Sequence, residues 1–178
     1  MSVIQIQNKQ FELYIPEEEI QKAVQKTALQ IRDDLQNNNP LFICVLNGAF
    51  MFAADLMKCC NFPSEITFVK LQSYQGMNST GNIKEIYGLL EDVEGRDVVI
   101  IEDVVDSGQT VSHLEQDIKK RNPKSFRIAT LLLKPEAVKT GIRPDYVAME
   151  IPNDFIVGYG LDYNGQGRNL KDIYVAKY

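Results

Sequence analysis

A short run of small and hydroxyl-bearing residues stands out in the segment 102–110, which reads EDVVDSGQT. Ser107, Gly108 and Thr110 can present backbone N–H groups and hydroxyls to a phosphate, with the positive end of the following helix behind them. The segment therefore predicts a phosphate cradle. The sequence contains no G-x-x-x-x-G-K motif, which argues against a nucleoside triphosphatase.

The acidic residues of the same segment indicate what is attached to the phosphate. Glu102 and Asp103 would repel a phosphate unless they faced vicinal ribose hydroxyls or a hydrated Mg2+ ion. A phosphorylated sugar supplies both a phosphate for the cradle and hydroxyl groups for the two acids. Asp106 lies inside the turn, where it can accept a proton from an incoming nitrogen nucleophile. A lone aspartate before a helix is usually a cap, but the clustering of these groups favours the functional interpretation.

Alternating strands and helices are expected to position this segment. We expect strands at 41–46, 65–74, 83–89, 97–102, 125–133, 145–151 and 155–161, and helices at 17–35, 49–60 and 109–121. Because several strands are apolar throughout, the pattern predicts an α/β fold with a mainly parallel twisted sheet flanked by helices, in a single domain of residues 1–178. Ligands of such sheets bind beyond the carboxyl ends of the strands, where the cradle lies.

The composition of the chain indicates which classes of binding partner and which cellular compartment to expect. The chain has 19 Lys and Arg against 24 Asp and Glu, and its net charge of -5 disfavours nucleic acid or an anionic membrane as the main partner. No signal-like or membrane-spanning apolar stretch is present. Cys44, Cys59 and Cys60 contain no CxxC pair and are expected to be reduced core residues, so we expect a cytoplasmic protein. The single histidine, His113, is expected to be structural or solvated.

The run VVIIEDVVDSGQT resembles the phosphoribosyl-pyrophosphate (PRPP) signature of type I phosphoribosyltransferases. Four further segments, LNGAFMFAADL, LQSYQGMNSTGNI, LLLKPE and PDYVAMEIPNDFIVGYGLDYNGQGRNL, resemble those of the hypoxanthine (hypoxanthine-guanine) phosphoribosyltransferases. The resemblance implies purine salvage, in which a Mg2+-dependent enzyme transfers 5-phosphoribosyl from PRPP to N9 of hypoxanthine, and of guanine, giving IMP or GMP and pyrophosphate. It also implies a small hood formed from the chain ends and a homodimer or homotetramer.

The resemblance further implies a role for each matching residue. Asp106 is the implied catalytic residue, facing purine N7. The implied ribose-phosphate site consists of Glu102, Asp103, Ser107, Gly108, Gln109 and Thr110. The implied pyrophosphate site consists of Leu46, Asn47, Gly48 and Arg168. The implied purine site consists of Lys134, Phe155 and Ile156. Mg2+ is implied at Asp162, with Glu102 and Asp103 beside it.

Two implied contacts can be checked against residue chemistry. Lys134 ends the apolar run TLLL, and an ammonium donor there suits purine O6; most lysines at strand ends are simply solvated. Phe155 can stack on a flat heterocycle, although its type fits a core aromatic almost as well.

Ser73 and Tyr74 resemble a pair in a lid, carried by the polar loop 75–82, that closes over the reacting centre and excludes water.

The chain also departs from the family pattern. Asn47 stands where the family often carries lysine, so phosphate contact there is expected to rest on backbone N–H groups. The segment 165–167 reads GQG, where acidic and aromatic residues are common, which affects the reach of Arg168. Two other functions fit the same signature: a regulator that uses the PRPP fold to sense nucleotides, and a transferase for xanthine.

Overall fold

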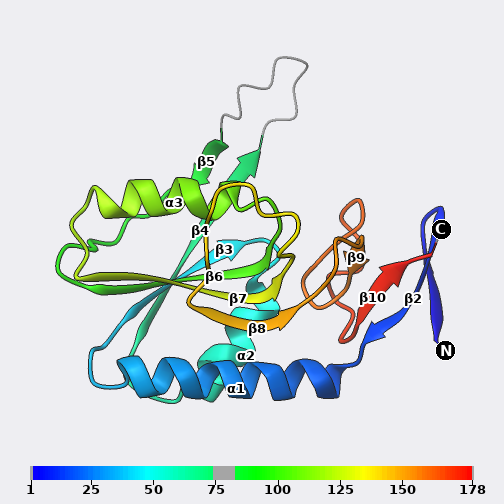
Figure 1. Cartoon of the computed structure of the whole chain (residues 1–178), viewed down its shortest axis with the longest axis horizontal. Helices are drawn as coiled ribbons and strands as arrows, with labels where there is room; N and C mark the ends of the chain where they lie inside the picture. Colours follow the sequence, from blue (N-terminus) through cyan, green and yellow to red (C-terminus); the bar gives the residue numbers. More distant parts are fainter. Residues whose placement is uncertain (1, 74–82, 178) are drawn as a thin grey trace.

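The larger of two sheets is mainly parallel, as the sequence predicted (Figure 1). The computed structural model of the chain describes residues 2–73 and 83–177. Within this part the sheet order is β5-β4-β3-β6-β7-β8, and β5 runs antiparallel to β4 while the other neighbours are parallel. The strands are β3 (Leu41–Leu46), β4 (Glu65–Ser73), β5 (Ile83–Tyr87), β6 (Asp97–Val105), β7 (Ser125–Leu133) and β8 (Tyr146–Glu150).

Helices cover both faces of this sheet. The helices α1 (Glu17–Leu35) and α2 (Phe50–Cys60) lie on one face and α3 (Gln109–Lys119) lies on the other (Figure 1). Most apolar side chains of α1 recur at helical spacing and are buried, whereas Leu29 is 47% exposed. Full burial of a large one such as Ile20, Ile31 or Leu35 stabilises the fold by about 1.5–3 kcal/mol. His113, on the solvent side of α3, has Nε2 3.4 Å from Asp117 Oδ2, consistent with the predicted solvated role.

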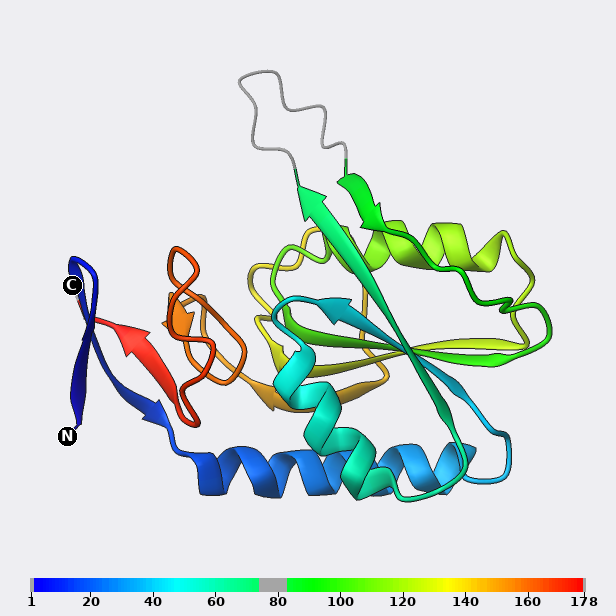
Figure 2. The same ribbon diagram turned by 180° about the vertical axis from the view of Figure 1, so that it is seen from behind.

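The chain ends form the second, smaller sheet, which lies beyond the start of α1 (Figure 2). Its antiparallel order is β1-β2-β10-β9. The strands are β1 (Val3–Ile6), β2 (Lys9–Ile15), β9 (Ile156–Val157) and β10 (Ile173–Ala176). Asp172, just before β10, accepts a hydrogen bond from the Glu17 N–H at 2.7 Å and so satisfies a donor at the start of α1. The function of this sheet as a hood stays a prediction.

Two predicted strands differ from the observed ones by three residues or more, while the expected strand 83–89 ends at Tyr87 and the expected helix 109–121 ends at Lys119. The expected strand 155–161 ends after Val157, because Gly158, Tyr159 and Gly160 have φ values of 106°, 47° and 100°, which an extended strand excludes. The expected strand 97–102 continues to Val105, so Asp103 lies within β6, together with Glu102, rather than after it.

Other expectations concern single residues and membrane segments. The cysteines are free as predicted, with Cys44 and Cys60 buried and Cys59 partly buried. They therefore serve as small core residues. In the part of the chain that the structure describes, no helix is long and apolar enough to cross a membrane.

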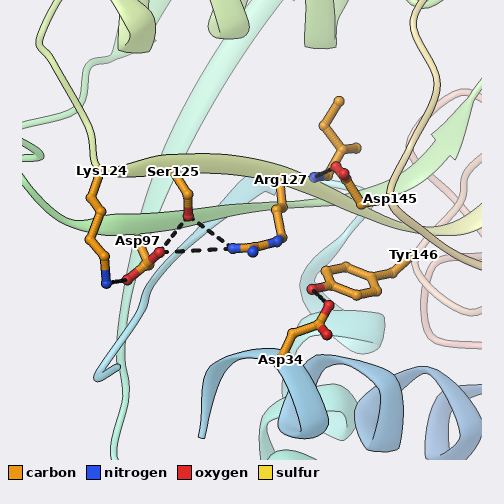
Figure 3. Close-up of polar contacts among 8 residues, drawn as sticks. Asp34, Asp97, Lys124, Ser125, Arg127, Asp145 and Tyr146 are labelled. Carbon is orange, nitrogen blue, oxygen red and sulfur yellow. Dashed lines mark hydrogen bonds and ion pairs between the residues drawn. The ribbon is translucent and has the colours of Figure 1, made fainter. Parts of the chain in front are cut away.

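A polar cluster ties the amino-terminal ends of β6 and β7 together (Figure 3). The buried Asp97 carboxylate accepts hydrogen bonds from Lys124 Nζ at 2.8 Å and from Ser125 Oγ at 2.5 Å. Arg127 Nη1 lies 3.8 Å from the same carboxylate. Burial raises the pKa of Asp97, but these partners outweigh burial and hold the pKa below its usual value. The cluster fixes the edge of the sheet opposite to the phosphate cradle.

Candidate active site

The cradle lies where β6 turns into α3. Gly108 occupies the position before α3 with φ 81°, a left-handed conformation that favours glycine. The Gln109 N–H points to Ser107 Oγ at 3.4 Å, so the turn places N–H groups and hydroxyls together at the helix start. A pocket of about 70 Å³ is lined by this turn. The structure thus brings five predicted ribose-phosphate residues to one pocket: Glu102, Ser107, Gly108, Gln109 and Thr110.

The loop after β7 packs against the cradle, a contact that the sequence analysis missed. The Lys139 N–H donates to the Ser107 carbonyl oxygen at 3.1 Å. A Cβ atom on Gly108 would overlap the Thr140 hydroxyl, so the cradle and the loop after β7 approach closely at this point. In the sequence, the glycine at position 108 was the one feature that indicated this close contact.

Glu102 and Asp103 lie side by side in a second pocket of about 140 Å³, between β6 and the end of β3. Glu102 is 8% exposed, and its Oε2 is buried with no hydrogen-bond partner among the described residues. Burial, together with the neighbouring Asp103, raises the pKa of Glu102 well above its usual value.

Asp103 is the more strongly partnered of the two acids. Burial raises its pKa to about 6, although a 2.8 Å hydrogen bond from the Val104 N–H and the charge of Arg168 act in the opposite direction. The negative charge of Asp162 raises the pKa further. The pocket therefore holds two carboxyl groups whose ionised forms lack sufficient positive charge around them.

The donor set fits a Mg2+ ion. Carboxylate oxygens are the protein ligands that Mg2+ prefers, and the unpartnered Glu102 Oε2 is a buried acceptor that a cation or its water would satisfy. Asp162 completes the predicted set, but its Oδ1 lies 2.6 Å from Arg168 Nη2 and its Oδ2 accepts the Gly165 N–H at 2.6 Å. Within residues 2–73 and 83–177, no cluster of three acids, histidines or cysteines would chelate a metal alone. This arrangement suits an ion that takes most ligands from water and substrate phosphate.

Two of the predicted pyrophosphate residues, Leu46 and Gly48, also line this pocket. Leu46 and Asn47 are joined by a cis peptide, and Gly48 follows them. A Cβ atom on Gly48 would overlap the Asp103 carboxylate, so this backbone approaches the acid closely. Asn47 leaves this loop without the lysine that the family often carries.

Arg168 lies near the same pocket, since its charge acts on Asp103. Its Nη1 donates to the Gly160 carbonyl oxygen at 2.7 Å, while Nη2 forms the ion pair with Asp162. The side chain is 29% exposed, so part of the guanidinium remains accessible to a ligand. The glycine-rich 165–167 segment therefore does not remove Arg168 from the site.

Asp106 and Lys134 form an ion pair at the carboxyl ends of β6 and β7. Lys134 Nζ lies 3.1 Å from Asp106 Oδ2. The lysine side chain is 9% exposed and the aspartate side chain is 51% exposed. Lys134 is therefore not a solvated lysine at a strand end, and its charge is directed at the predicted catalytic acid.

Phe155 and Ile156 lie with the smaller sheet. The Phe155 ring is 39% exposed and packs against Phe11 and Tyr163, with centroid separations of 6.2 Å and 5.8 Å. Ile156 pairs with Val175 of β10 and is buried. Lys9 Nζ lies over the Phe155 ring, 5.3 Å from its centroid, and the stacking of a purine on this ring stays a prediction. Of the predicted lid, Ser73 ends β4 opposite Ile83, whereas Tyr74 and the loop 75–82 lie outside the described residues.

The fold and the site together define a transferase of phosphorylated ribose. A family model described as "Phosphoribosyl transferase domain" matches residues 15–164, and the chain belongs to this family. Within the family, its relatives include the hypoxanthine-guanine phosphoribosyltransferase of Bacillus subtilis (strain 168), which is 45% identical over 92% of this chain and 91% of the relative. The enzyme of the same name from Mycobacterium bovis is 41% identical over 88% of this chain and 81% of its own length.

Solved structures agree with the sequence relatives. A hypoxanthine phosphoribosyltransferase from Staphylococcus aureus has a TM-score of 0.89 and 36% identity, covering 93% of this chain and 91% of that chain. The hypoxanthine phosphoribosyl transferase of Trypanosoma cruzi has a TM-score of 0.89 and 33% identity, covering 98% of this chain and 95% of that chain. The predicted family and the predicted α/β fold are thereby confirmed.

Proposed function

We propose that this chain is a purine-salvage enzyme that transfers 5-phosphoribosyl from PRPP to N9 of hypoxanthine and guanine, releasing pyrophosphate. The observation that carries the proposal is the Asp106–Lys134 pair, 3.1 Å apart, directly beside the phosphate cradle. A 6-oxopurine carries N7 and O6 on one edge, so one residue pair can address both atoms.

The cradle and the acids of β6 hold the sugar. The N–H groups and hydroxyls of residues 107–110 bind the 5'-phosphate at the start of α3. Glu102 and Asp103 bind the ribose hydroxyls. Arg168 and the backbone of the loop 46–48 bind the pyrophosphate that leaves. Gripping the sugar at both ends leaves its anomeric carbon exposed to the incoming base.

Asp106 and Lys134 orient the base and manage its proton. Lys134 donates to O6, and an amino group at that ring position would set donor against donor. When N7 carries the proton, the N9 lone pair is available to attack the anomeric carbon. The C1–N9 bond forms as the C1–O bond to pyrophosphate breaks, and Asp106 accepts the proton from N7. Phe155 contributes a face for stacking, and the Ile156 backbone pairs with the ring edge.

Mg2+ is part of the proposal. Glu102, Asp103 and Asp162 would hold the ion through oxygen ligands, in part through water. When bound, Mg2+ neutralises charge on the pyrophosphate group and so makes it a better leaving group. The residues described above then supply the positioning of sugar and base, while the predicted lid at Ser73 and Tyr74 excludes water.

Pyrophosphate release tests the proposed function. Purified protein is incubated with PRPP, Mg2+ and, in turn, hypoxanthine, guanine, xanthine and adenine. We expect release with hypoxanthine and guanine, little with adenine, and none when EDTA is present. Release with xanthine above that with hypoxanthine would identify the chain as a xanthine enzyme instead. PRPP binding with no turnover of any purine would favour a nucleotide-sensing regulator.

We also propose a homodimer or homotetramer located in the cytoplasm. The T. cruzi relative supports the first part, since its C-terminal region has a role in its oligomeric state and enzymatic activity. Light scattering on the eluted protein measures the mass of the assembly, and a mass of about 20 kDa would contradict the proposal.

A further inference from the structure

Tyr159 is a buried tyrosine in an unusual backbone position close to the pyrophosphate residues. It is 1% exposed and has φ 47°, between two glycines that also have positive φ. A non-glycine residue in this region costs energy, so other contacts must hold it there. The Tyr159 hydroxyl donates to Asp55 Oδ2 at 2.7 Å, a short bond between the segment after β9 and the helix α2.

Asp55 is the ionised acceptor of this bond. Its Oδ2 also accepts from Gln21 Nε2 of α1 at 2.8 Å, and its Oδ1 lies 3.0 Å from Lys58 Nζ. Burial raises the pKa of Asp55, but the hydrogen bonds from Gln21, Tyr159 and Lys58 outweigh burial and hold the pKa below its usual value. A bond to an ionised carboxylate is roughly twice as strong as a neutral one.

Gly160, the next residue after Tyr159, forms two hydrogen bonds with Arg168. The Gly160 N–H donates to the Arg168 carbonyl oxygen at 2.9 Å, and Arg168 Nη1 donates to the Gly160 carbonyl oxygen at 2.7 Å. A Cβ atom on Gly160 would overlap the carbonyl group of Gly48, so the two backbones are in direct contact. Gly160 is thus packed between the predicted pyrophosphate loop and the predicted pyrophosphate-binding arginine.

We propose that Tyr159 and Asp55 are positioning residues for the pyrophosphate group of PRPP, an inference that rests on the proposed function. The helix α2 begins at Phe50, directly after the loop that ends at Gly48. The Tyr159–Asp55 bond therefore fixes the separation between that loop and the segment of Arg168. A ligand held by both segments depends on this separation, whereas Lys134 and Asp106, which orient the base, follow β7 and β6 and lie outside both segments.

Tyr159→Phe is the direct test, because it removes only the hydroxyl. We expect the Kd and the KM for PRPP to rise about tenfold, the size of one hydrogen bond to a charged acceptor, while the KM for hypoxanthine stays within about twofold of wild type. Lys58→Met is the matched control, since it removes a different hydrogen bond from the same Asp55 carboxylate, and the exposed Lys58 side chain lies on α2 rather than on the 158–168 segment. Its affinity for PRPP should equal that of wild type.

Asp55 provides a second pair of variants. Asp55→Asn keeps an oxygen that accepts the Tyr159 hydroxyl, so its PRPP affinity should lie closer to wild type than that of Asp55→Ala. Calorimetry with PRPP and Mg2+ measures binding independently of turnover, and thermal unfolding reports on stability. The inference is wrong if Tyr159→Phe lowers only the unfolding temperature, or if Lys58→Met weakens PRPP binding equally. If the wild-type protein binds PRPP but turns over no purine, the proposed function is wrong, while the positioning role of Tyr159 and Asp55 is not contradicted.

Discussion

Lys134 Nζ and Asp106 Oδ2 lie 3.1 Å apart, so the residue predicted to face purine O6 is paired with the residue predicted to face purine N7. The lysine is buried and the aspartate is half exposed. Removing Asp106 and removing Lys134 should therefore change the electrostatic energy of the site by different amounts. Loss of Asp106 leaves a buried ammonium without its counter-charge, whereas loss of Lys134 leaves a carboxylate that water can reach.

Lys134→Ala should weaken purine binding while sparing PRPP. A hydrogen bond to or from a charged group is worth about 1.5–3 kcal/mol, which corresponds to about ten- to a hundredfold in the KM for hypoxanthine. The Kd for PRPP, measured by calorimetry, should stay unchanged. Lys134→Arg keeps the charge but not the geometry and should recover only part of the affinity. An unchanged KM for hypoxanthine in Lys134→Ala would refute the role of the lysine.

Asp106→Asn should slow the transfer step. A positioned acid–base group contributes about 10²–10⁴ to a rate, so kcat should fall by a factor in that range when product formation is followed under saturating substrates. Asp33→Asn, at an exposed position on α1, serves as the charge control and should keep the wild-type rate. If Asp106→Asn and Asp106→Ala both turn over at the wild-type rate, the proton acceptor lies elsewhere.

Gly48→Ala should displace the Asp103 carboxylate. The added Cβ would overlap that carboxylate, which must move because the Gly48 backbone is itself packed against Gly160. A misplacement of about 1 Å at a reacting site can cost about 10²-fold in rate, so kcat/KM for PRPP should fall to about that extent. Circular dichroism should show that the fold is retained. A variant with wild-type kcat/KM would show that the position of Asp103 is not important.

Asp97→Asn should destabilise the protein in a pH-dependent way. Because the pKa of Asp97 in the folded protein is held below its usual value of 3.8, the carboxylate contributes stability above that pH and loses it as the pH falls through the lower folded value. We expect a loss of about 1–3 kcal/mol in the free energy of unfolding at pH 7. The difference from wild type should shrink between pH 5 and the acid limit.

Asp117→Asn is the control for this experiment. The Asp117 carboxylate is 41% exposed and pairs with Lys120 on the surface of α3. Exposed pairs contribute about 0–1 kcal/mol, so the urea unfolding curves of this variant should stay close to wild type at each pH. Equal losses in the two variants, or a loss in Asp97→Asn that does not change with pH, would contradict the role assigned to the Asp97 cluster.

Local patterns in the sequence were sufficient to predict most of the larger sheet. The helix α1 begins and ends where the periodicity of Ile20 to Leu35 predicted, and the phosphate cradle follows β6 as its small residues indicated. These features depend on residues close in sequence, which pattern analysis can detect. The family resemblance then supplied roles for single residues, and those roles stay predictions until variants are measured.

Long-range contacts account for what was missed. The run IVGYGL reads as an apolar strand, but the positive φ values at Gly158, Tyr159 and Gly160 follow from contacts with distant segments. The glycines on either side of Tyr159 were the available signal, since paired glycines in a strand often mark a bend or a close backbone approach. The Tyr159–Asp55 bond joins residues 104 positions apart and left no local pattern.

The order of strands in the smaller sheet has a consequence for biosynthesis. β10, at residues 173–176, lies between β2 and β9, so neither of those strands can find this partner while the ribosome still holds the last residues of the described chain. The parallel sheet, by contrast, is complete once residue 150 has emerged. Enzymatic competence should therefore be acquired late, after translation has passed the final strand.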